Sequence, residues 1–215
     1  VHDVYFGFIP EHQTYGIDNY FRLPLWAWFI DWFHKTRTRP VDTCELLQYD
    51  NILTRHQQPT EHSANKRFCN FIYSNLVGSR INFFQQLSQY RLVESTGKVL
   101  NNTGYLIGNR LDGRHAQTKT EDLVNYKFNI AFENTIAEGY ITEKLLEPLA
   151  AGCVPIYFGD VSCKHDFNPK SFIYVRDFKN FAEAIEYIKY VDRDEQVFNT
   201  YLKEPVFLAP PIYTP

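Results

Sequence analysis

The sequence predicts an α/β fold built on a parallel sheet with helices on both of its faces. After residue 66, short apolar runs alternate with segments in which apolar residues recur at helical spacing. Alternating strands and helices are typical of parallel sheets, because each helix returns the chain to the edge where the next strand begins. Ligands of such sheets bind beyond the carboxyl ends of the strands, so we expect the chemistry in the loops that follow them.

Strands are expected where short runs are rich in aromatic and β-branched residues, at 68–73, 129–132, 154–158 and 172–175. Helices are expected over 80–90 and 140–151, and a third begins after Asn180. Glu183 stands three residues after Asn180, which is the spacing of a capping box. Pro148 lies inside the second helix and is expected to end or bend it, since proline cannot donate a backbone hydrogen bond.

Composition bounds the class of protein. The 215 residues fit one large domain or two small ones, and 44% of them are hydrophobic. The 22 basic and 25 acidic residues give a net charge of −3, which does not favour a nucleic-acid partner that is bound through phosphate charge. The longest apolar stretch, 149–159, has eleven residues, whereas a membrane-spanning helix needs about 20.

The cysteines predict buried free thiols. Cys44, Cys69, Cys153 and Cys163 form no C-x-x-C pair, and the seven histidines have no ligand spacing, so no metal site is expected. The polar segment 41–66 is the expected linker or domain edge. The chain starts at Val1 and contains no Met, so we interpret it as a fragment, a processed form or the ordered part of a longer protein.

Two segments carry candidate chemistry. The polar loop after the strand ending at Phe132 leads into a helix expected to begin near Tyr140, with Lys144 in its first turns. A helix start attracts anions through free backbone N–H groups, so we interpret it as a phosphate-facing element. Arg80 follows a strand and a glycine-containing loop and could direct its guanidinium at a phosphate. The plain alternatives are an amphipathic helix with a solvated polar face and an exposed arginine.

These residues lie in long motifs that resemble the α-1,3/1,4-fucosyltransferases, glycosyltransferase family ten, and most closely its short bacterial members. The motifs are YKFNIAFEN at 126–134, GYITEK at 139–144, GCVPIYFG at 152–159, FCNFIYSN at 68–75, NNTG at 101–104 and DFNPKSF at 166–172. The match covers about residues 66–176. Residues 1–40 match more weakly, chiefly through RLPL at 22–25.

The resemblance implies a GT-B fold, in which two Rossmann-like domains face a cleft and the C-terminal one holds GDP-fucose. It implies that Arg80 and Lys144 contact the donor diphosphate, and that Asn134, Tyr140 and Glu143 complete the site. The expected reaction is an inverting transfer of fucose from GDP-fucose to an N-acetylglucosamine-containing glycan, in α-1,3 or α-1,4 linkage. No permanent cofactor is implied, and a divalent metal would at most stimulate without a recognisable ligating motif.

The resemblance also implies an incomplete N-terminal domain. The family's general base is a Glu placed, by the register of residues 3–8, upstream of Val1, and Glu11 falls after that segment. We therefore expect residues 1–64 to be the remnant of an acceptor-side domain with its linker, 65–195 the GDP-fucose-binding domain, and 196–215 a C-terminal tail. The family's biology implies protein glycosylation and Lewis antigens. The expected location is the cytoplasm or the inner-membrane surface in a bacterium, and the Golgi membrane in a eukaryote.

Two alternative functions and the role of the tryptophans stay open at this point. A nucleotide-sugar binding module without catalysis would keep Arg80 and Lys144 and lack a base. A glycosidase could use Glu133 and Glu143, since paired carboxylates suffice for glycoside hydrolysis. The three tryptophans could pack in the core, stack on an acceptor sugar or, with the cations that follow them, contact a membrane near residues 26–39; they are Trp26, Trp28 and Trp32.

Overall fold

The computed structural model describes residues 4–9, 17, 19–32, 46–57, 65–107, 115–209 and 211, and leaves the side chains of 115–117 undescribed. Several residues weighed in the sequence lie outside these ranges: Glu11, Lys35, Arg37, Arg39 and Cys44.

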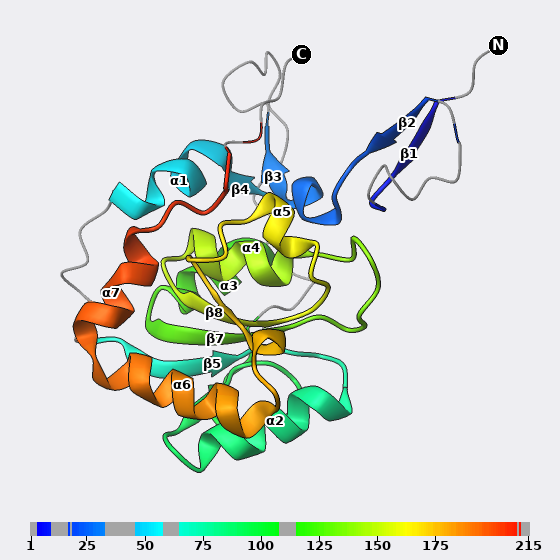
Figure 1. Cartoon of the computed structure of the whole chain (residues 1–215). Helices are drawn as coiled ribbons and strands as arrows, with labels where there is room; N and C mark the ends of the chain where they lie inside the picture. The colour runs from blue at the N-terminus through cyan, green and yellow to red at the C-terminus, as the bar shows by residue number, and fades with distance from the viewer. Residues whose placement is uncertain are drawn as a thin grey trace.

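A five-stranded parallel sheet forms the centre of the molecule, in the order β6-β5-β7-β8-β9 (Figure 1). The strands are β5 (Arg67–Phe71), β6 (Val93–Ser95), β7 (Tyr126–Phe132), β8 (Val154–Phe158) and β9 (Ile173–Tyr174). The predicted α/β class with a parallel sheet is confirmed. The last strand is shorter than the expected 172–175, because the chain enters a 3-10 helix at Val175–Asp177.

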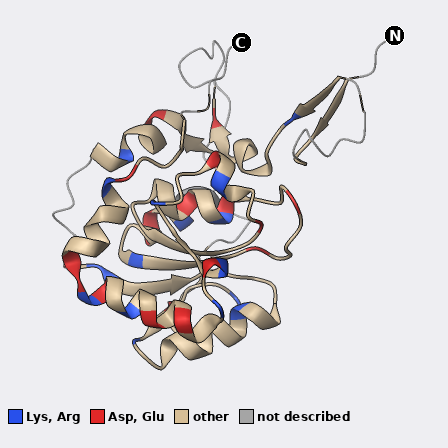
Figure 2. Ribbon diagram, viewed as in Figure 1, with Lys and Arg blue, Asp and Glu red and all other residues tan. Residues whose placement is uncertain are grey.

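Helices cover both faces of this sheet, as expected (Figure 1). On one face Phe128, Ile130 and Phe132 of β7 join an apolar cluster with α2 (Gly78–Ser88), α6 (Phe181–Arg193) and α7 (Glu195–Lys203). On the other face Ala131 and Tyr157 join a second cluster. That face carries α1 (Tyr49–Thr54), α3 (His115–Leu123), α4 (Glu143–Ala150) and α5 (Cys163–Asp166). Lys and Arg are interspersed with Asp and Glu along α4 and α6 (Figure 2).

The helix predicted over 140–151 begins later than expected. It runs Glu143–Ala150, with Thr142 as the N-cap residue that accepts a hydrogen bond from the Lys144 N–H. The expected start near Tyr140 is therefore wrong, since a Thr with extended backbone can accept that bond and a Tyr cannot. The helix ends two residues after Pro148, and Gly152 at φ +70° closes it in the left-handed region.

The capping signal of the third helix is confirmed. The Asn180 side chain accepts a hydrogen bond from the Glu183 N–H at 3.0 Å. The Glu183 carboxylate turns back one residue further than a capping box requires and accepts from the Lys179 N–H at 3.0 Å.

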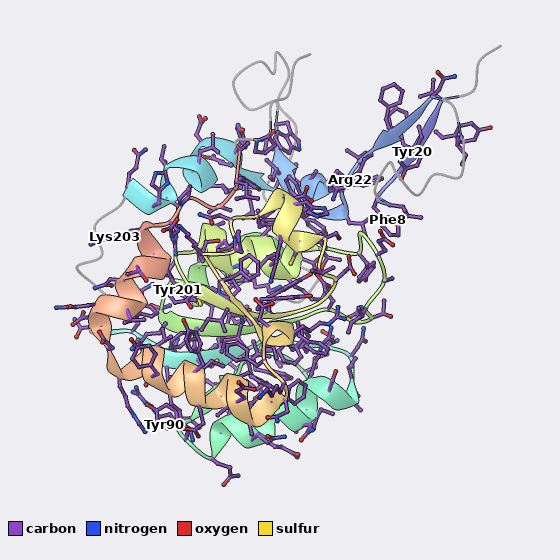
Figure 3. All side chains as sticks on the ribbon, in the orientation of Figure 1. Phe8, Tyr20, Arg22, Tyr90, Tyr201 and Lys203 are labelled. Carbon is purple, nitrogen blue, oxygen red and sulfur yellow. The ribbon has the colours of Figure 1, made fainter. Side chains whose placement is uncertain are left out.

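The N-terminal residues form two small parallel pairs beside the sheet. β1 (Tyr5–Gly7) pairs with β2 (Tyr20–Arg22) and stands apart from the body, and β3 (Ile30–Asp31) pairs with β4 (Leu47–Gln48) (Figure 1). Arg22 anchors the first pair by a bidentate contact of 2.7 and 2.6 Å with the Asp166 carboxylate of α5. In Figure 3 Arg22 lies where this pair meets the body.

The tryptophans have different environments. Trp26 belongs to the second apolar cluster and donates its indole N–H to Asp166 at 2.9 Å. Trp32 is half-buried and donates to the Ala27 carbonyl at 2.7 Å, whereas Trp28 is 66% exposed. Core packing thus describes Trp26. Within the described residues no helix is both long and apolar enough to cross a membrane.

The described cysteines are buried free thiols, as predicted. Cys69 lies in the first apolar cluster and Cys163 in the second. Cys153 belongs to a third, small cluster with Leu123 and Tyr126.

Candidate functional site

The strand order predicts a ligand-binding crevice between the carboxyl ends of β5 and β7. The chain leaves β5 toward β6 on one side, whereas it leaves β7 toward β8 on the other. Where successive crossovers diverge in this way, the loops at the carboxyl ends of the two strands separate and leave room for a ligand. Arg80 follows β5, and Asn134 follows β7.

Arg80 links the two sides of this crevice. Its Nε and Nη2 donate to the Phe132 carbonyl at 3.1 and 2.7 Å, and Nη2 also donates to Asn134 Oδ1 at 2.6 Å. The guanidinium carbon lies 4.0 Å from the centre of the Tyr73 ring. Arg80 is only 1% exposed, so the alternative of an exposed arginine is wrong. Its Nη1 has no hydrogen-bond partner among the described residues, which leaves one nitrogen of a buried cation, with its two N–H groups, for a ligand.

The start of α2 beside Arg80 is uncapped. Val77 is the N-cap residue and offers no side-chain acceptor, and the first turn holds no acidic residue. Gly78 has open space where a side chain would be, since no heavy atom lies within 4 Å of that position. Unbonded N–H groups at a helix start bind anions, so α2 and Arg80 together form an anion-binding corner.

The start of α4 is already occupied by a carboxylate of the chain. Glu133, the residue after β7, accepts the Thr142 N–H at 2.8 Å, and its two oxygens lie 3.0 and 2.9 Å from the Thr142 hydroxyl. Lys144 Nζ is 3.4 Å from Glu133 Oε2 and 3.0 Å from Thr142 Oγ1. The interpretation of this helix start as free N–H groups facing a phosphate is therefore wrong in part, because the Thr142 and Lys144 N–H groups have internal acceptors.

Glu143 extends the charge cluster toward α3. Its Oε1 lies 3.2 Å from Lys144 Nζ. Burial by itself raises the pKa of Glu143, but Lys144 and Lys119 outweigh it and hold that pKa at about 2. Lys119 of α3 forms a buried ion pair with Glu147, which fixes α3 against α4. The Glu143 carboxylate is thus ionised at neutral pH.

The loop between β7 and α4 is held from both sides. The Gly139 N–H lies 3.2 Å from Asp160 Oδ1 and 3.2 Å from Ser162 Oγ, beyond the end of β8. Gly139 has φ +71°, and a side chain there would meet the Phe8 carbonyl oxygen. The next residue, Tyr140, places its ring 6.3 Å from the Phe8 ring in an edge contact. Figure 3 shows Phe8 between β1 and this loop.

The predicted site residues gather around the end of β7 in two hydrogen-bonded pairs. Arg80 contacts Asn134, and Glu143 contacts Lys144. Tyr140 lies in the loop before α4, outside the helix that was expected to begin near it, and its ring contacts Phe8.

Sequence reasoning missed the role of two residues, Glu133 and Thr142. Thr142 was detectable, because it is a cap-type residue just before the helix. Glu133 was weighed only as a glycosidase carboxylate, and its contact with Lys144 and lack of exposed side-chain surface do not suit a nucleophile. Across the described ranges no three His, Cys, Asp or Glu side chains gather to hold a metal ion.

Comparison with known proteins gives a consistent picture. The family model for the C-terminal part of glycosyltransferase family 10 (fucosyltransferase) matches residues 62–204. The chain is 35% identical over 205 residues to the alpha-(1,3)-fucosyltransferase FucT of Helicobacter pylori, covering 87% of the chain and 41% of that protein. It is 33% identical over 196 residues to GDP-fucose protein O-fucosyltransferase 3 of Xenopus tropicalis, covering 89% and 39%.

A solved structure agrees with these matches. The crystal structure of an alpha1,3-fucosyltransferase with GDP-fucose superposes with a TM-score of 0.70 at 31% identity. It covers 95% of this chain and 62% of its own, and the likeness supports the expected GT-B architecture. The chain thus spans about two fifths of the curated relatives' length.

Proposed function

The chain belongs to glycosyltransferase family 10, the fucosyltransferases, and we propose that the β5–β7 crevice binds GDP-fucose for transfer of its fucose. The observation that carries this proposal is the unpartnered Nη1 of buried Arg80 beside the uncapped start of α2. A diphosphate at this corner would satisfy both. Arg80 follows β5 and Asn134 follows β7, the two neighbouring strands from which the chain departs in opposite directions.

The chemistry suits departure of a nucleoside diphosphate. When the bond between fucose and GDP breaks, negative charge develops on the diphosphate, and cations fixed beforehand lower the barrier. We assign this role to Arg80 Nη1 and the Lys144 ammonium. Asn134 would keep the Arg80 fork in place, while Tyr140 and the ionised Glu143 would contact the sugar and ribose hydroxyl groups as hydrogen-bonding partners.

The acceptor is proposed to be an N-acetylglucosamine-containing glycan, joined in α-1,3 or α-1,4 linkage with inversion. A related protein named alpha-(1,3)-fucosyltransferase supports the glycan, and the relatives named protein O-fucosyltransferase make a protein acceptor the competing arm of the test. The attacking hydroxyl must lose its proton to a base. We assign that base to neither Glu133 nor Glu143, because Lys144 contacts both carboxylates.

We propose that residues 65–195 form the donor-binding unit, between an acceptor-side remnant with its linker at 1–64 and a C-terminal tail at 196–215. A peripheral membrane contact near residues 26–39 would use Trp28, whose side chain is exposed.

Titration with GDP tests the donor site. Isothermal calorimetry should show GDP binding by the chain, and Lys144→Met should weaken it by about 1.5–3 kcal/mol, the value of a charge-assisted contact. Lys189→Met is the matched control, because Lys189 pairs with Glu186 on α6. Equal GDP affinity in Lys144→Met and the control would refute the assignment.

A transfer assay tests the reaction. Labelled GDP-fucose is offered with an N-acetylglucosamine-containing oligosaccharide or with a folded protein acceptor, to this chain and to one extended upstream. Fucose on the oligosaccharide supports the proposal, and fucose on the protein replaces the acceptor class. GDP binding without transfer by either chain would favour the non-catalytic module.

A further inference from the structure

A fully buried carboxylate lies directly behind the Lys144 ammonium. The Glu133 side chain has no exposed surface, whereas Lys144 retains 13% exposure. The proposed function assigns a diphosphate contact to Lys144 and no role to Glu133. A buried carboxylate is costly unless it is paired, so its position requires an explanation.

The Thr142 hydroxyl connects the two charges. A hydroxyl has one proton to donate, and both Glu133 oxygens lie within 3.0 Å of Thr142 Oγ1. Because that proton goes to Glu133, the hydroxyl oxygen is left to accept from Lys144 Nζ at 3.0 Å. The result is a directed chain from Lys144 through Thr142 to Glu133, beside the 3.4 Å ion pair.

The walls around Glu133 fix its orientation. The Tyr157 hydroxyl lies 3.4 Å from Glu133 Oε1 on the β8 side. Gly159 makes this approach possible, since a Cβ on it would meet the Tyr157 hydroxyl and stand 3.0 Å from Glu133 Cγ. The Glu133 side chain is therefore held in one position between the ends of β7 and β8, from which it contacts Thr142 and Lys144.

We propose that Glu133 is a positioning residue for the fucosyl donor, which acts through Thr142 to hold the Lys144 ammonium at the crevice for the diphosphate. The inference rests on the proposed function and adds a residue that the family resemblance did not assign. Glu133 does not touch the donor. Its effect reaches the diphosphate only through Lys144.

The electrostatics of Lys144 agree with this role. Burial alone would lower the pKa of Lys144, but Glu133 and Glu143 outweigh it, and the pKa is raised. The charged and titratable groups around Lys144 come from α4, the loop before it, the residue after β7, and α3. They are Glu143, Glu147, Tyr140, Glu133 and Lys119. Without the Glu133 charge, less opposes the lowering of the Lys144 pKa by burial, so the ammonium should lose its proton at lower pH.

The first experiment measures Lys144 directly in the unliganded chain. Competitive acetylation followed by mass spectrometry, from about pH 7 to about pH 11, reports the fraction of unprotonated amine. Glu133→Gln should shift the Lys144 profile to lower pH, and Glu133→Asp, which keeps the charge, should restore it toward wild type. Lys189 in the same digests is the internal control. An unchanged Lys144 profile in folded Glu133→Gln would overturn the inference.

The second experiment measures GDP affinity against pH. Wild type and Glu133→Asp should bind GDP with little change between about pH 7 and about pH 9.5, whereas Glu133→Gln should lose about tenfold over that range. A residue that only stabilised the fold would lower affinity equally at every pH, and that result would overturn the inference while the proposed function stands. If wild type does not bind GDP, the proposed function fails and the inference with it.

If Glu133→Gln does not fold, Thr142→Val and Thr142→Ser provide the comparison. Thr142→Val removes the hydroxyl between Lys144 and Glu133 and should weaken GDP binding, whereas Thr142→Ser keeps the hydroxyl and should bind within about threefold of wild type. Equal GDP affinity of the two variants would overturn the role of the hydrogen bonds that lead from Lys144 through Thr142 to Glu133.

Discussion

The starts of α2 and α4 lie at the same edge of one sheet and differ in what occupies them. The α2 start has no side-chain cap, and buried Arg80 beside it keeps one nitrogen without a hydrogen-bond partner in the described part of the chain. The α4 start is filled by Glu133 and Thr142 of the chain. The comparison teaches that a helix start after a parallel strand is an anion site only when the protein has not already placed its own acceptor there.

Replacement of Arg80 should have the largest effect, because Arg80 serves both the fold and the open helix start. Arg80→Met removes the donor to Asn134 Oδ1 and both guanidinium donors to the Phe132 carbonyl, which keeps only the Tyr73 hydroxyl at 3.0 Å. The free energy of unfolding should fall by about 3–4 kcal/mol. Urea denaturation measures the loss, and GDP titration of the folded fraction should show weaker binding. An Arg80→Lys variant keeps the charge without the fork and should lie between. Wild-type stability in Arg80→Met would mean that the α2 corner does not depend on this cation.

Removal of the cation at the filled helix start should produce a pH-dependent instability. Burial already raises the pKa of Glu133 against the opposing Lys144, so Lys144→Met should raise it further. The native state then holds this proton more tightly than the unfolded chain does, and stability falls as pH rises from about 4.3 through the native pKa. At neutral pH the loss should be about 3 kcal/mol, the lower range for breaking a buried pair.

Thermal unfolding of Lys144→Met from about pH 4 to about pH 8 measures this effect. Adding Glu133→Gln to Lys144→Met removes the titrating group and should flatten the profile toward that of wild type. A profile that stays steep in the double variant would assign the instability to another group.

Filling the open helix start should make it resemble the other one. Val77→Asp adds a cap to α2 where the backbone is already extended, and should raise stability by about 0.5–2 kcal/mol. The same carboxylate would compete with a diphosphate, so GDP affinity should fall about tenfold. Val77→Asn caps without charge and should weaken GDP binding less. If Asp and Asn have equal effects on GDP, the α2 start is not the phosphate site.

The smallest effect is expected at Gly78. No atom obstructs a side chain there, so Gly78→Ala should raise the free energy of unfolding by about 0.5–1 kcal/mol through lower entropy of the unfolded chain. GDP affinity should stay at the wild-type value, as judged by calorimetry. A large loss of affinity would show that the diphosphate approaches the Gly78 backbone more closely than a methyl group allows.

The sequence predicts the strands and the placement of Arg80 because local patterns carry that information. Apolar runs mark β5, β7 and β8, and a strand, a glycine loop and a cation mark the α2 start. The burial of Arg80 could not be predicted, since its acceptors, Phe132 and Asn134, lie 52 and 54 residues further along the chain.

The filled start of α4 shows a different limit. The sequence pattern predicts a helix from near Tyr140, although Thr142 carries the cap signal. That Glu133 would turn inward depends on the space left by Gly159, directly after the neighbouring strand β8, which no local pattern reveals. Local patterns and the family resemblance both singled out Arg80 and Lys144 as candidate donor contacts, whereas the internal acceptor Glu133 became visible only in three dimensions.

The three described thiols give the protein built-in reporters of local opening. Burial raises the pKa of Cys69 and Cys163, and raises that of Cys153 to about 12, so very little thiolate exists at neutral pH in the closed state. Each thiol lies in a different apolar cluster. The alkylation rate of each cysteine should therefore report how often its own apolar cluster opens locally. A nucleotide that contacts the ends of both β5 and β7 should slow the alkylation of Cys69 most, because Cys69 lies in β5.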